Sequence, residues 1–312
     1  MQEFIPIIDI ERLEDPGSLA AIDQACREWG FFQVTGHGID RRLIEDIFAV
    51  SREFFAMPAT GKRCLLRDAQ NPWGYYDREL TKNRQDAKEI YDFGPNDGGQ
   101  LPPRWPAGPF GRRFEHAMRT YYASCQGVAM RLLSAIALNL GVDPADLAGR
   151  FDHDHSSFLR LNYYRRTLAA REAGAGTFPF GVGEHTDSGA LTVLLQDACP
   201  GLEVHRDGRW HLIEPRADAL VVNIGDMVQV WSNDRYRAAL HRAITNPVVD
   251  RYSVPFFLNP SYQTVYAPLP ATVSELNPAR YRPISWREFR GLRAAGDYAD
   301  LGEEVQISHY RR

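Results

Sequence analysis

The sequence predicts a mainly β fold with helices, in which a double-stranded β-helix, or jelly roll, forms the core behind a helical N-terminal region. Residues 155–260 contain short β-forming runs separated by turn residues, which is the pattern of a jelly roll. Residues 114–140 show apolar side chains at helical spacing and end before Gly141. One domain spanning residues 1–312 is expected, because β barrels often reach ~200–250 residues as one unit.

Three parts of this domain are expected in chain order. Residues 1–150 should form a mixed helical N-terminal region, and residues 155–260 should form the jelly-roll core. Residues 285–312 should form a C-terminal helix and tail. Ser285 and Glu288 match a capping box, which predicts the start of that helix and its packing across the barrel or its entrance.

Composition indicates a globular chain with a full core, because 44% of the residues are hydrophobic and 24% are charged. The net charge of −4 and the pI near 6.2 argue against a nucleic-acid partner and an anionic membrane surface. We expect no secretion signal, no membrane-spanning run and no protein partner. The four scattered cysteines are typical of reduced thiols, which predicts a cytoplasmic location.

Two histidines and an aspartate in this chain have the pattern of an iron site. His185-Thr186-Asp187 places two ligand side chains on the same side of an extended backbone, because strand side chains alternate with period two. The distant His241 supplies a second imidazole. Two neutral nitrogens and one carboxylate cover one face of an octahedral Fe(II) and leave three positions open, as oxygen activation requires. A lone His-x-Asp is more often a loop pair, so the interpretation depends on its context.

The segment around these ligands is expected to be rich in strands. Strands are predicted at Gly189–Gln196, Ala219–Ile224, Val228–Trp231 and Ala238–Ile244. The last of these ranges contains the third ligand. Several short strands therefore separate the second ligand from the third in sequence.

An arginine lies close to the third ligand in the sequence. Asn246-Pro247 is a turn signal, and a hairpin symmetric about Pro247 would place His241 opposite Ser253. Arg251 would then share their face of the sheet. A guanidinium beside a metal can bind a carboxylate in bidentate fashion without itself touching the metal.

With these residues in place, the sequence resembles the isopenicillin N synthase-like branch of the Fe(II)/2-oxoglutarate-dependent dioxygenases. The resemblance covers most of the chain. Besides the metal motif and Arg251-x-Ser253, it rests on segments in the following order: Pro6-Ile7-Ile8-Asp9-Ile10, Trp29-Gly30-Phe31-Phe32-Gln33-Val34, Gly36-His37-Gly38-Ile39, Phe54-Phe55-Ala56-Met57-Pro58, Asn162-Tyr163-Tyr164, Gly201-Leu202-Glu203-Val204, Val222-Asn223-Ile224-Gly225-Asp226 and Trp231-Ser232-Asn233.

The resemblance implies a role for each of the residues named so far. It implies that His185, Asp187 and His241 bind Fe(II), and that Arg251 with Ser253 anchors the far carboxylate of 2-oxoglutarate. An enzyme of this family uses Fe(II), 2-oxoglutarate and O2. The identity of the co-substrate as 2-oxoglutarate is implied by the resemblance alone.

Asn162 and Tyr164 match family positions that also contact 2-oxoglutarate. They share parity on a strand, so both can face the barrel interior. The chain departs from the plant-type pattern after Tyr164, where Arg165-Arg166 and a Gly-rich stretch to Gly183 replace a Pro-Pro-Cys-Pro run.

The activity implied by the resemblance is that of a non-haem iron dioxygenase of secondary metabolism. It would hydroxylate, desaturate or cyclise a small organic metabolite and release succinate and CO2. The alternatives are a family oxidase that does not use 2-oxoglutarate, an ethylene-forming enzyme that fragments 2-oxoglutarate, and a non-enzymatic jelly roll that binds a metal. Oxygen uptake that depends on 2-oxoglutarate and succinate release that depends on iron distinguish these cases.

Arg160 and Phe257 are the candidate substrate-binding residues, because each shares inward parity with a predicted co-substrate residue. Together they suggest a substrate with an acidic or strongly polar group and an apolar body. The alternative is that Arg160 pairs with a buried acid such as Asp226. Residues 73–93 are a candidate lid, unless their aromatic residues belong to the core: Trp73, Tyr75, Tyr76, Tyr91 and Phe93.

The remaining histidines are not expected to bind metal. His153-Asp154-His155 offers ligand atoms at the same spacing, but it lacks a downstream Arg-x-Ser and is interpreted as a solvated loop. The others are expected to be surface or hydrogen-bonded residues: His37, His116, His205, His211 and His309.

Overall fold

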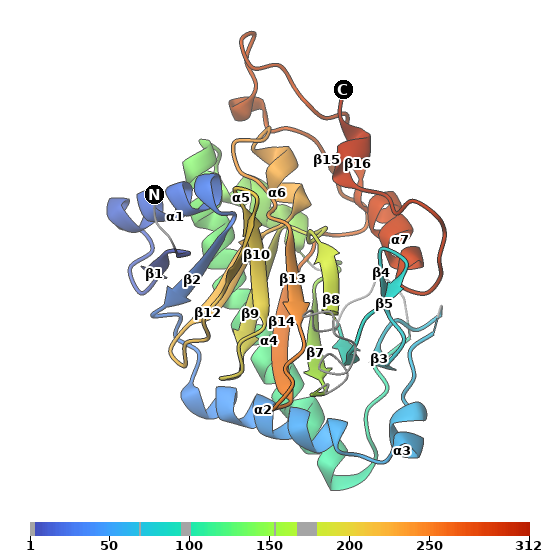
Figure 1. The fold of residues 1–312 in the computed structure, drawn as a ribbon. Coiled ribbons are helices and arrows are strands. Elements are labelled where there is room, and N and C mark those ends of the chain that lie inside the picture. The colour runs from blue at the N-terminus through green and yellow to red at the C-terminus, as the bar shows by residue number, and fades with distance from the viewer. Residues whose placement is uncertain (1–3, 69, 95–100, 153, 167–179) are drawn as a thin grey trace.

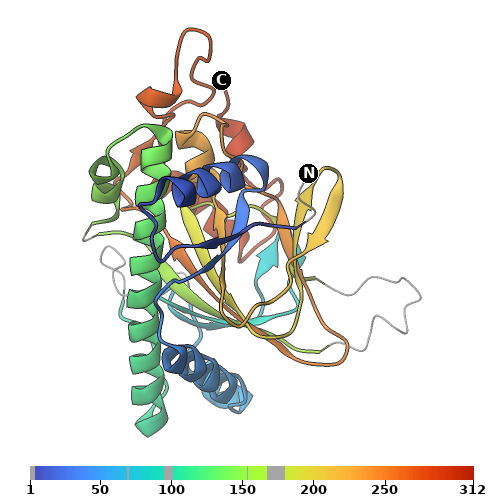
Figure 2. The same cartoon turned by 90° about the vertical axis from the view of Figure 1, so that its left-hand side faces the viewer.

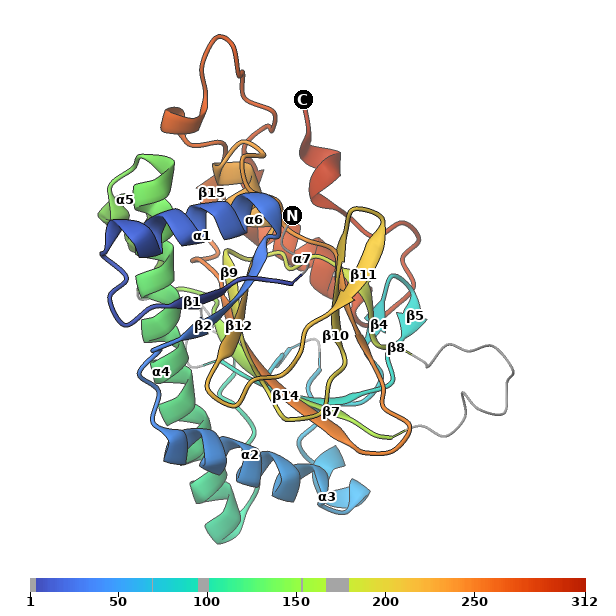
Figure 3. The same ribbon diagram turned by 60° about the vertical axis from the view of Figure 1, so that its left-hand side comes forward.

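Two β-sheets face each other and enclose the interior of a barrel (Figure 3). The computed structural model describes residues 4–68, 70–94, 101–152, 154–166 and 180–312. The larger sheet contains, in spatial order, β1 (Ile7–Asp9), β2 (Phe31–Thr35), β12 (Leu220–Ile224), β9 (Leu191–Gln196), β14 (Arg251–Leu258), β7 (Phe158–Tyr164), β6 (Glu89–Phe93) and β3 (Gly74–Tyr76). Only β1 and β2 pair in parallel among these neighbours.

The smaller sheet carries both predicted histidine ligands. It contains, in spatial order, β11 (Arg209–Leu212), β10 (Leu202–Arg206), β13 (His241–Ile244) and β8 (Phe180–His185). Two further strand pairs lie outside these sheets: β4 (Leu80–Thr81) with β5 (Arg84–Gln85), and β15 (Val265–Tyr266) with β16 (Ile284–Ser285). The jelly-roll expectation is confirmed.

Helices cover the outer face of the larger sheet. The α-helices are α1 (Pro16–Glu28), α2 (Arg41–Phe55), α3 (Ala59–Arg63), α4 (Gly108–Leu140), α5 (Pro144–Ala148), α6 (Asp226–Trp231) and α7 (Trp286–Gly296), and short 3-10 turns occur at Gly149–Phe151, Pro270–Thr272 and Ile307–Tyr310. Figures 1 and 2 show α4 running along the sheet, with α1 and α2 beside it.

Helix α4 confirms the predicted helix over 114–140, although it begins earlier, at Gly108. By length and composition alone it would qualify as a membrane span. Its apolar stripe is buried and belongs to the large cluster formed with the other helices and the sheet. Gly141 ends the helix in a left-handed conformation, with φ of 76°, which glycine adopts without strain.

A second, smaller apolar cluster lies inside the barrel. Its members are Ile5, Trp29, Phe31, Leu194, Leu202, Val204, Ile213 and Val221. Three of them, Phe31, Leu194 and Leu202, also border the cavity that holds the predicted site. The cluster therefore limits how far water extends into the barrel from that cavity.

The expected strand at Val228–Trp231 is wrong, because this segment forms helix α6. The first N–H groups of a helix need partners from outside the helix. Here the Asp226 amide donates to the Asp187 carbonyl at 2.7 Å, and the Met227 amide donates to Gly189 at 3.2 Å. The loop that carries Asp187 thus provides hydrogen-bond acceptors for the first amides of the helix. These hydrogen bonds outweigh the preference of valine for β-strands.

The expected hairpin about Pro247 is also wrong. His241 pairs with His185 on β8 and with Val204 on β10, whereas Ser253 pairs with Asn162 on β7 and with Gln196 on β9. Strands β13 and β14 therefore enter different sheets. They still face each other across the barrel, because the two sheets enclose one interior.

The predicted C-terminal helix is confirmed as α7. The Ser285 hydroxyl accepts a hydrogen bond from the Glu288 amide at 3.4 Å, as a capping residue does. Arg293 on this helix donates to the Thr186 carbonyl at 2.9 Å. Helix α7 is therefore attached to the loop between two of the predicted ligands.

We expect Leu132→Ala to destabilise the fold by about 2–5 kcal/mol, because Leu132 is fully buried on α4 and its truncation leaves a cavity. Leu138→Ala on the same helix is the control, since Leu138 is 50% exposed and should change stability by less than about 0.5 kcal/mol. Urea unfolding followed by circular dichroism measures both. Equal losses would contradict the packing of α4.

Candidate metal centre

Three side chains converge at the end of the smaller sheet. His185 ends β8, His241 begins β13, and the two residues are direct cross-strand partners. Their Nε2 atoms lie 3.6 and 3.7 Å from Oδ1 of Asp187, which follows β8 by two residues. One ligand atom from each residue can therefore reach a common metal ion.

Backbone carbonyls orient both imidazoles. Nδ1 of His185 lies 2.8 Å from the Gly183 oxygen, and Nδ1 of His241 lies 3.0 Å from the Ala239 oxygen. A carbonyl can only accept, so Nδ1 carries the proton in each ring and donates it. Each Nε2 then keeps its lone pair directed at the shared site, as metal-ligating histidines require.

Two buried side chains hold the carboxylate. Oδ2 of Asp187 accepts hydrogen bonds from the Thr192 hydroxyl and, at 2.8 Å, from the Asn223 amide. Oδ1 is left for a metal. Burial alone would raise the pKa of Asp187, but the two imidazoles and these hydrogen bonds hold it below its usual value. The ligand carboxylate is therefore ionised at neutral pH.

His185 is suited to binding a cation as a neutral base. Burial, together with the neighbouring His241, lowers the pKa of His185 to about 3. The imidazole is thus neutral across the physiological range. Metal binding need not displace a proton from this side chain.

The predicted co-substrate anchor, Arg251, is only 1% exposed. It donates through Nη2 to Gln196 Oε1 at 2.9 Å and through Nε to the Cys199 carbonyl at 3.3 Å. Its Nη1 is buried and has no hydrogen-bond partner among the described residues. A buried guanidinium with an unused donor fits a ligand carboxylate.

The other three predicted co-substrate residues surround this guanidinium. Arg251 pairs across the sheet with Tyr164, and Ser253 pairs with Asn162. The Tyr164 ring lies 4.9 Å from the guanidinium carbon, and the Asn162 amide donates to the Ser253 hydroxyl at 3.2 Å. Gly181 opposite Tyr164 has no room for a side chain, because an added Cβ would lie 2.4 Å from the ring.

All nine residues singled out from the sequence line one cavity, which we call the barrel cavity. They are His185, Asp187, His241, Arg251, Ser253, Asn162, Tyr164, Arg160 and Phe257. A two-histidine, one-carboxylate donor set suits Fe(II), and the unused Arg251 donor suits an anionic co-substrate in the same space. The residues present therefore fit both groups.

Arg160 is already paired within the protein. Its guanidinium donates to both oxygens of Asp92, at 2.7 and 2.8 Å, and to both oxygens of Glu79, at 2.8 and 2.9 Å. The expectation that Arg160 could pair with a buried acid is confirmed, but the suggested partner, Asp226, is wrong. Phe257 lines the cavity as predicted and stacks on Phe158 with ring centroids 4.5 Å apart.

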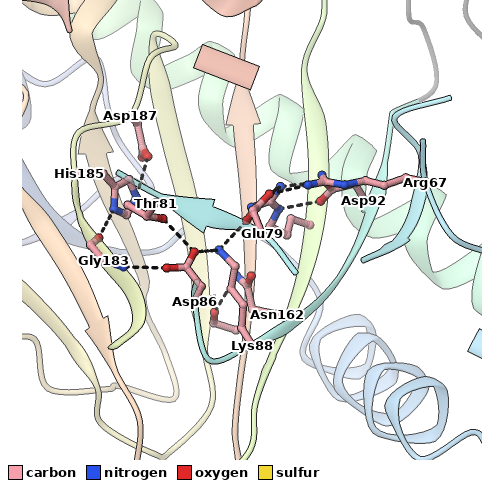
Figure 4. Close-up of polar contacts among 12 residues, drawn as sticks. Arg67, Glu79, Thr81, Asp86, Lys88, Asp92, Asn162, Gly183, His185 and Asp187 are labelled. Atoms are coloured by element: carbon pink, nitrogen blue, oxygen red, sulfur yellow. Dashed lines mark hydrogen bonds and ion pairs between the residues drawn. The ribbon is translucent and has the colours of Figure 1, made fainter. Parts of the chain in front are cut away.

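A chain of polar contacts leads from these acids to His185 (Figure 4). Lys88 bridges Glu79 Oε2 at 2.6 Å and Asp86 Oδ2 at 3.0 Å. Asp86 Oδ1 accepts from the Gly183 amide at 3.1 Å, and the Gly183 carbonyl is the group that accepts from His185. Lys88, Glu79 and Asp86 were not predicted from the sequence, since no local motif connects them to His185.

A second cavity adjoins the metal site and is bordered by α7. We call it the α7 cavity. It shares His185, Asp187, Lys88, Arg160, Val182 and Phe257 with the barrel cavity, and it adds Glu79, Leu80, Thr81, Phe158, Thr186, Ser188, Gly189, Asn259, Trp286, Arg290, Arg293, Asp297 and Glu304. The capping-box pattern predicts helix α7, but not the position of its basic and acidic side chains on this cavity.

The proposed lid at 73–93 needs correction. Its five aromatic residues are buried and none of them lines either cavity. The segment does border the α7 cavity, but through Glu79, Leu80, Thr81 and Lys88. The aromatic residues are core residues.

No other histidine joins a metal-binding cluster within the described part of the chain. His155 is 5% exposed and contacts the Gln126 amide at 3.1 Å, so its interpretation as part of a solvated loop is wrong. His153 lies outside the described residues, as does most of the Gly-rich stretch before Gly183.

Comparison with known proteins agrees with this geometry. Residues 155–260 match the family model of the 2OG-Fe(II) oxygenase superfamily, and residues 5–108 match that of the non-haem dioxygenase in morphine synthesis N-terminal region. The chain is 36% identical over 295 residues to gibberellin 20 oxidase 1-D of Triticum aestivum, covering 91% of this chain and 80% of that protein. It is 32% identical to flavanone 3-dioxygenase 2 of Oryza sativa, covering 91% and 82%.

Solved structures show the same fold. The crystal structure of JOX2 in complex with 2OG, Fe and JA superposes with a TM-score of 0.83 at 30% identity, covering 98% of this chain and 88% of that one. A full-length Neurospora crassa protein in complex with alpha-KG and thymine gives a TM-score of 0.85 at 26% identity, covering 95% and 98%. The fold, the His-Asp-His cluster and these relatives together place the chain in the 2OG-Fe(II) oxygenase superfamily, to which it belongs.

Proposed function

We propose that His185, Asp187 and His241 hold Fe(II) and that Arg251 and Ser253 anchor 2-oxoglutarate. The protein is an Fe(II)- and 2-oxoglutarate-dependent dioxygenase that oxidises a small organic metabolite. The observation that supports these residue roles is a single cavity that contains both the metal-ligand atoms and the unused Arg251 donor.

When bound, Fe(II), 2-oxoglutarate and O2 supply the oxidation of a substrate C–H bond, with release of succinate and CO2. The residues of this chain supply binding and orientation. His185 and His241 offer lone pairs at Nε2. Thr192 and Asn223 donate to Oδ2 of Asp187, which leaves Oδ1 for the metal. The contribution of the protein is to decide which substrate hydrogen lies next to the metal.

The α7 cavity is the proposed substrate site, because it borders both His185 and Asp187. Phe257 and Phe158 form a stacked aromatic wall there. A small molecule with an apolar portion and a polar or acidic group fits such a cavity. The relatives include a gibberellin 20 oxidase and a flavanone 3-dioxygenase, and these activities favour a substrate from secondary metabolism.

We also propose a cytoplasmic location. All four cysteines, Cys26, Cys64, Cys125 and Cys199, are free thiols. Reduced thiols are typical of the cytosol, where ferrous iron is also maintained. Cell fractionation followed by immunoblotting tests this location.

A metabolite-library screen scored by succinate formation tests the proposed activity. The enzyme is loaded with Fe(II) and 2-oxoglutarate without oxygen and is then given an oxygen pulse. Iron- and 2-oxoglutarate-dependent succinate release above the substrate-free rate identifies a substrate. Oxygen uptake that does not depend on 2-oxoglutarate would contradict the proposed co-substrate.

His185→Ala and His241→Ala are each expected to lose bound iron and all turnover, because two ligands cannot maintain the facial set. Anaerobic iron titration and succinate assays measure the two effects. His205→Ala is the control, since His205 lies outside the cluster, against Trp210. Full activity in either ligand variant would disprove the assignment of the triad.

Arg251→Ala is expected to weaken 2-oxoglutarate binding by ~2–5 kcal/mol, because a carboxylate left without its buried partner loses a charge-assisted pair. Iron affinity should change much less. Calorimetric titration with Fe(II) present gives both constants. An unchanged affinity for 2-oxoglutarate would place the anchor elsewhere.

Asn223→Ala is expected to weaken iron binding by roughly 10–100-fold, because it removes a hydrogen bond that orients Asp187. Asn139→Ala is the matched control, since its amide donates to the Leu19 carbonyl far from the site. Both variants lose one side-chain amide that donates a hydrogen bond, so a general loss of stability should affect both. Equal iron affinities in the two variants would rule out the orienting role.

A further inference from the structure

The charges on the wall of the α7 cavity are largely neutralised within the protein. Four basic residues line this wall among the described residues: Lys88, Arg160, Arg290 and Arg293. Lys88 and Arg160 belong, with Arg67, to a buried network of ion pairs. Three acids balance these three cations: Glu79, Asp86 and Asp92. Because the network is neutral, Arg160 offers little net positive charge to a ligand.

The third basic residue, Arg293, is also engaged. It donates to the carbonyls of Thr186 and Val305 and to the Gln306 side chain, and its Nε lies 3.6 Å from Glu304 Oε1. Arg293 is buried, so these contacts fix its position. Arg293 therefore holds α7 against the segment between His185 and Asp187.

Arg290 differs from these three residues. Among the described residues, no carboxylate lies within 4.0 Å of its guanidinium and no hydrogen bond is formed by it. Its guanidinium carbon lies 5.9 Å from the centroid of the Phe158 ring. It is half-buried on the inner side of α7, which leaves a cation on the cavity wall available for an anion.

An acid without an ion pair among the described residues lies on the same side of the helix. Asp297 ends α7 seven residues after Arg290, which is about two helical turns, and it lines the same cavity. Its backbone carbonyl accepts from the Leu80 amide at 3.0 Å, which fixes that end of the helix against β4 (Figure 1). Burial and the nearby Glu79 raise the pKa of the Asp297 carboxyl to about 6, although the positive charge of Arg290 opposes the rise.

We propose that the α7 cavity binds an amphoteric substrate, a small amino acid or amine-bearing acid, with its carboxylate at Arg290 and its ammonium group at Asp297. The inference rests on the proposed function of the cavity as the substrate site. It replaces Arg160 with Arg290 as the residue that selects the acidic group. Two side chains of opposite charge on one cavity wall discriminate against molecules that lack either group.

The position of the stacked aromatic pair places the substrate relative to the metal. Phe158 contacts Arg290 on one side and stacks on Phe257, which lines both cavities. A substrate held by Arg290 therefore has its apolar portion against this wall and directed towards His185. The charged ends bind at α7, and the C–H bonds lie on the metal side.

Three matched compound sets test the inference on the iron-loaded enzyme with 2-oxoglutarate. The first set is the free proteinogenic amino acids with their β- and γ-amino analogues, the second is their N-acetyl derivatives, and the third is their carboxamides. We expect at least one free amino acid to raise succinate formation above the substrate-free rate. Its N-acetyl and carboxamide forms should be about 100-fold less effective, because each leaves a charged group of the protein unpaired.

Arg290→Gln and Asp297→Asn are expected to raise the KM of the accepted amino acid by about tenfold or more while the Kd of 2-oxoglutarate stays near its original value. Arg290→Gln should also abolish the preference for the acid over its carboxamide. Arg287→Gln and Asp300→Asn are the controls, because both residues are exposed and lie outside the cavity.

Two results would overturn the inference. One is stimulation by no free amino acid, and the other is equal stimulation by the derivatives. A protein that binds neither iron nor 2-oxoglutarate would instead overturn the proposed function, so the two failures are distinguishable.

Discussion

The cross-strand pair of His185 and His241 is the contact on which the rest of the site depends. Strand pairing fixes the distance between the two imidazoles, and backbone carbonyls fix their tautomers. Asp187, the third proposed ligand, lies beyond the strand, so strand pairing cannot position it. Helix α6 does so instead, because its first amides bind the Asp187 and Gly189 carbonyls. The site therefore combines a rigid sheet with a loop held by a helix start.

The backbone groups on the outer edge of β8 bond to the segment that contains Asp86 and Ala87. Strand β8 is the last strand of the smaller sheet, so one row of its backbone groups has no strand partner. The Gly183 amide on that edge donates to Asp86, and the Phe180 carbonyl accepts from the Ala87 amide at 3.0 Å. A buried ion network is weak evidence for stability, since desolvation offsets most of the attraction between its charges. Here it fixes the strand that carries His185, a proposed iron ligand.

Strand parity explains how much of the site was predictable from the sequence. Asn162 with Tyr164, and Arg251 with Ser253, face the interior because residues two apart on a strand share a face in any sheet. The hairpin and the strand at 228–231 were wrong because both depend on which segments pair, and pairing is decided by distant residues. The same limit applies to Glu79 and Asp86, because their partners Arg160 and Gly183 are far away in sequence.

Arg160 shows why a cavity's charge cannot be read from its lining residues alone. From the sequence it is an inward arginine, and inward arginines suggest an anionic ligand. Glu79 and Asp92 come from the segment before α4 and receive four of its N–H contacts. Removing either acid would leave part of that positive charge facing the barrel cavity. Acids behind the wall can therefore change which substrates this fold accepts, because they decide which cations on the wall remain available.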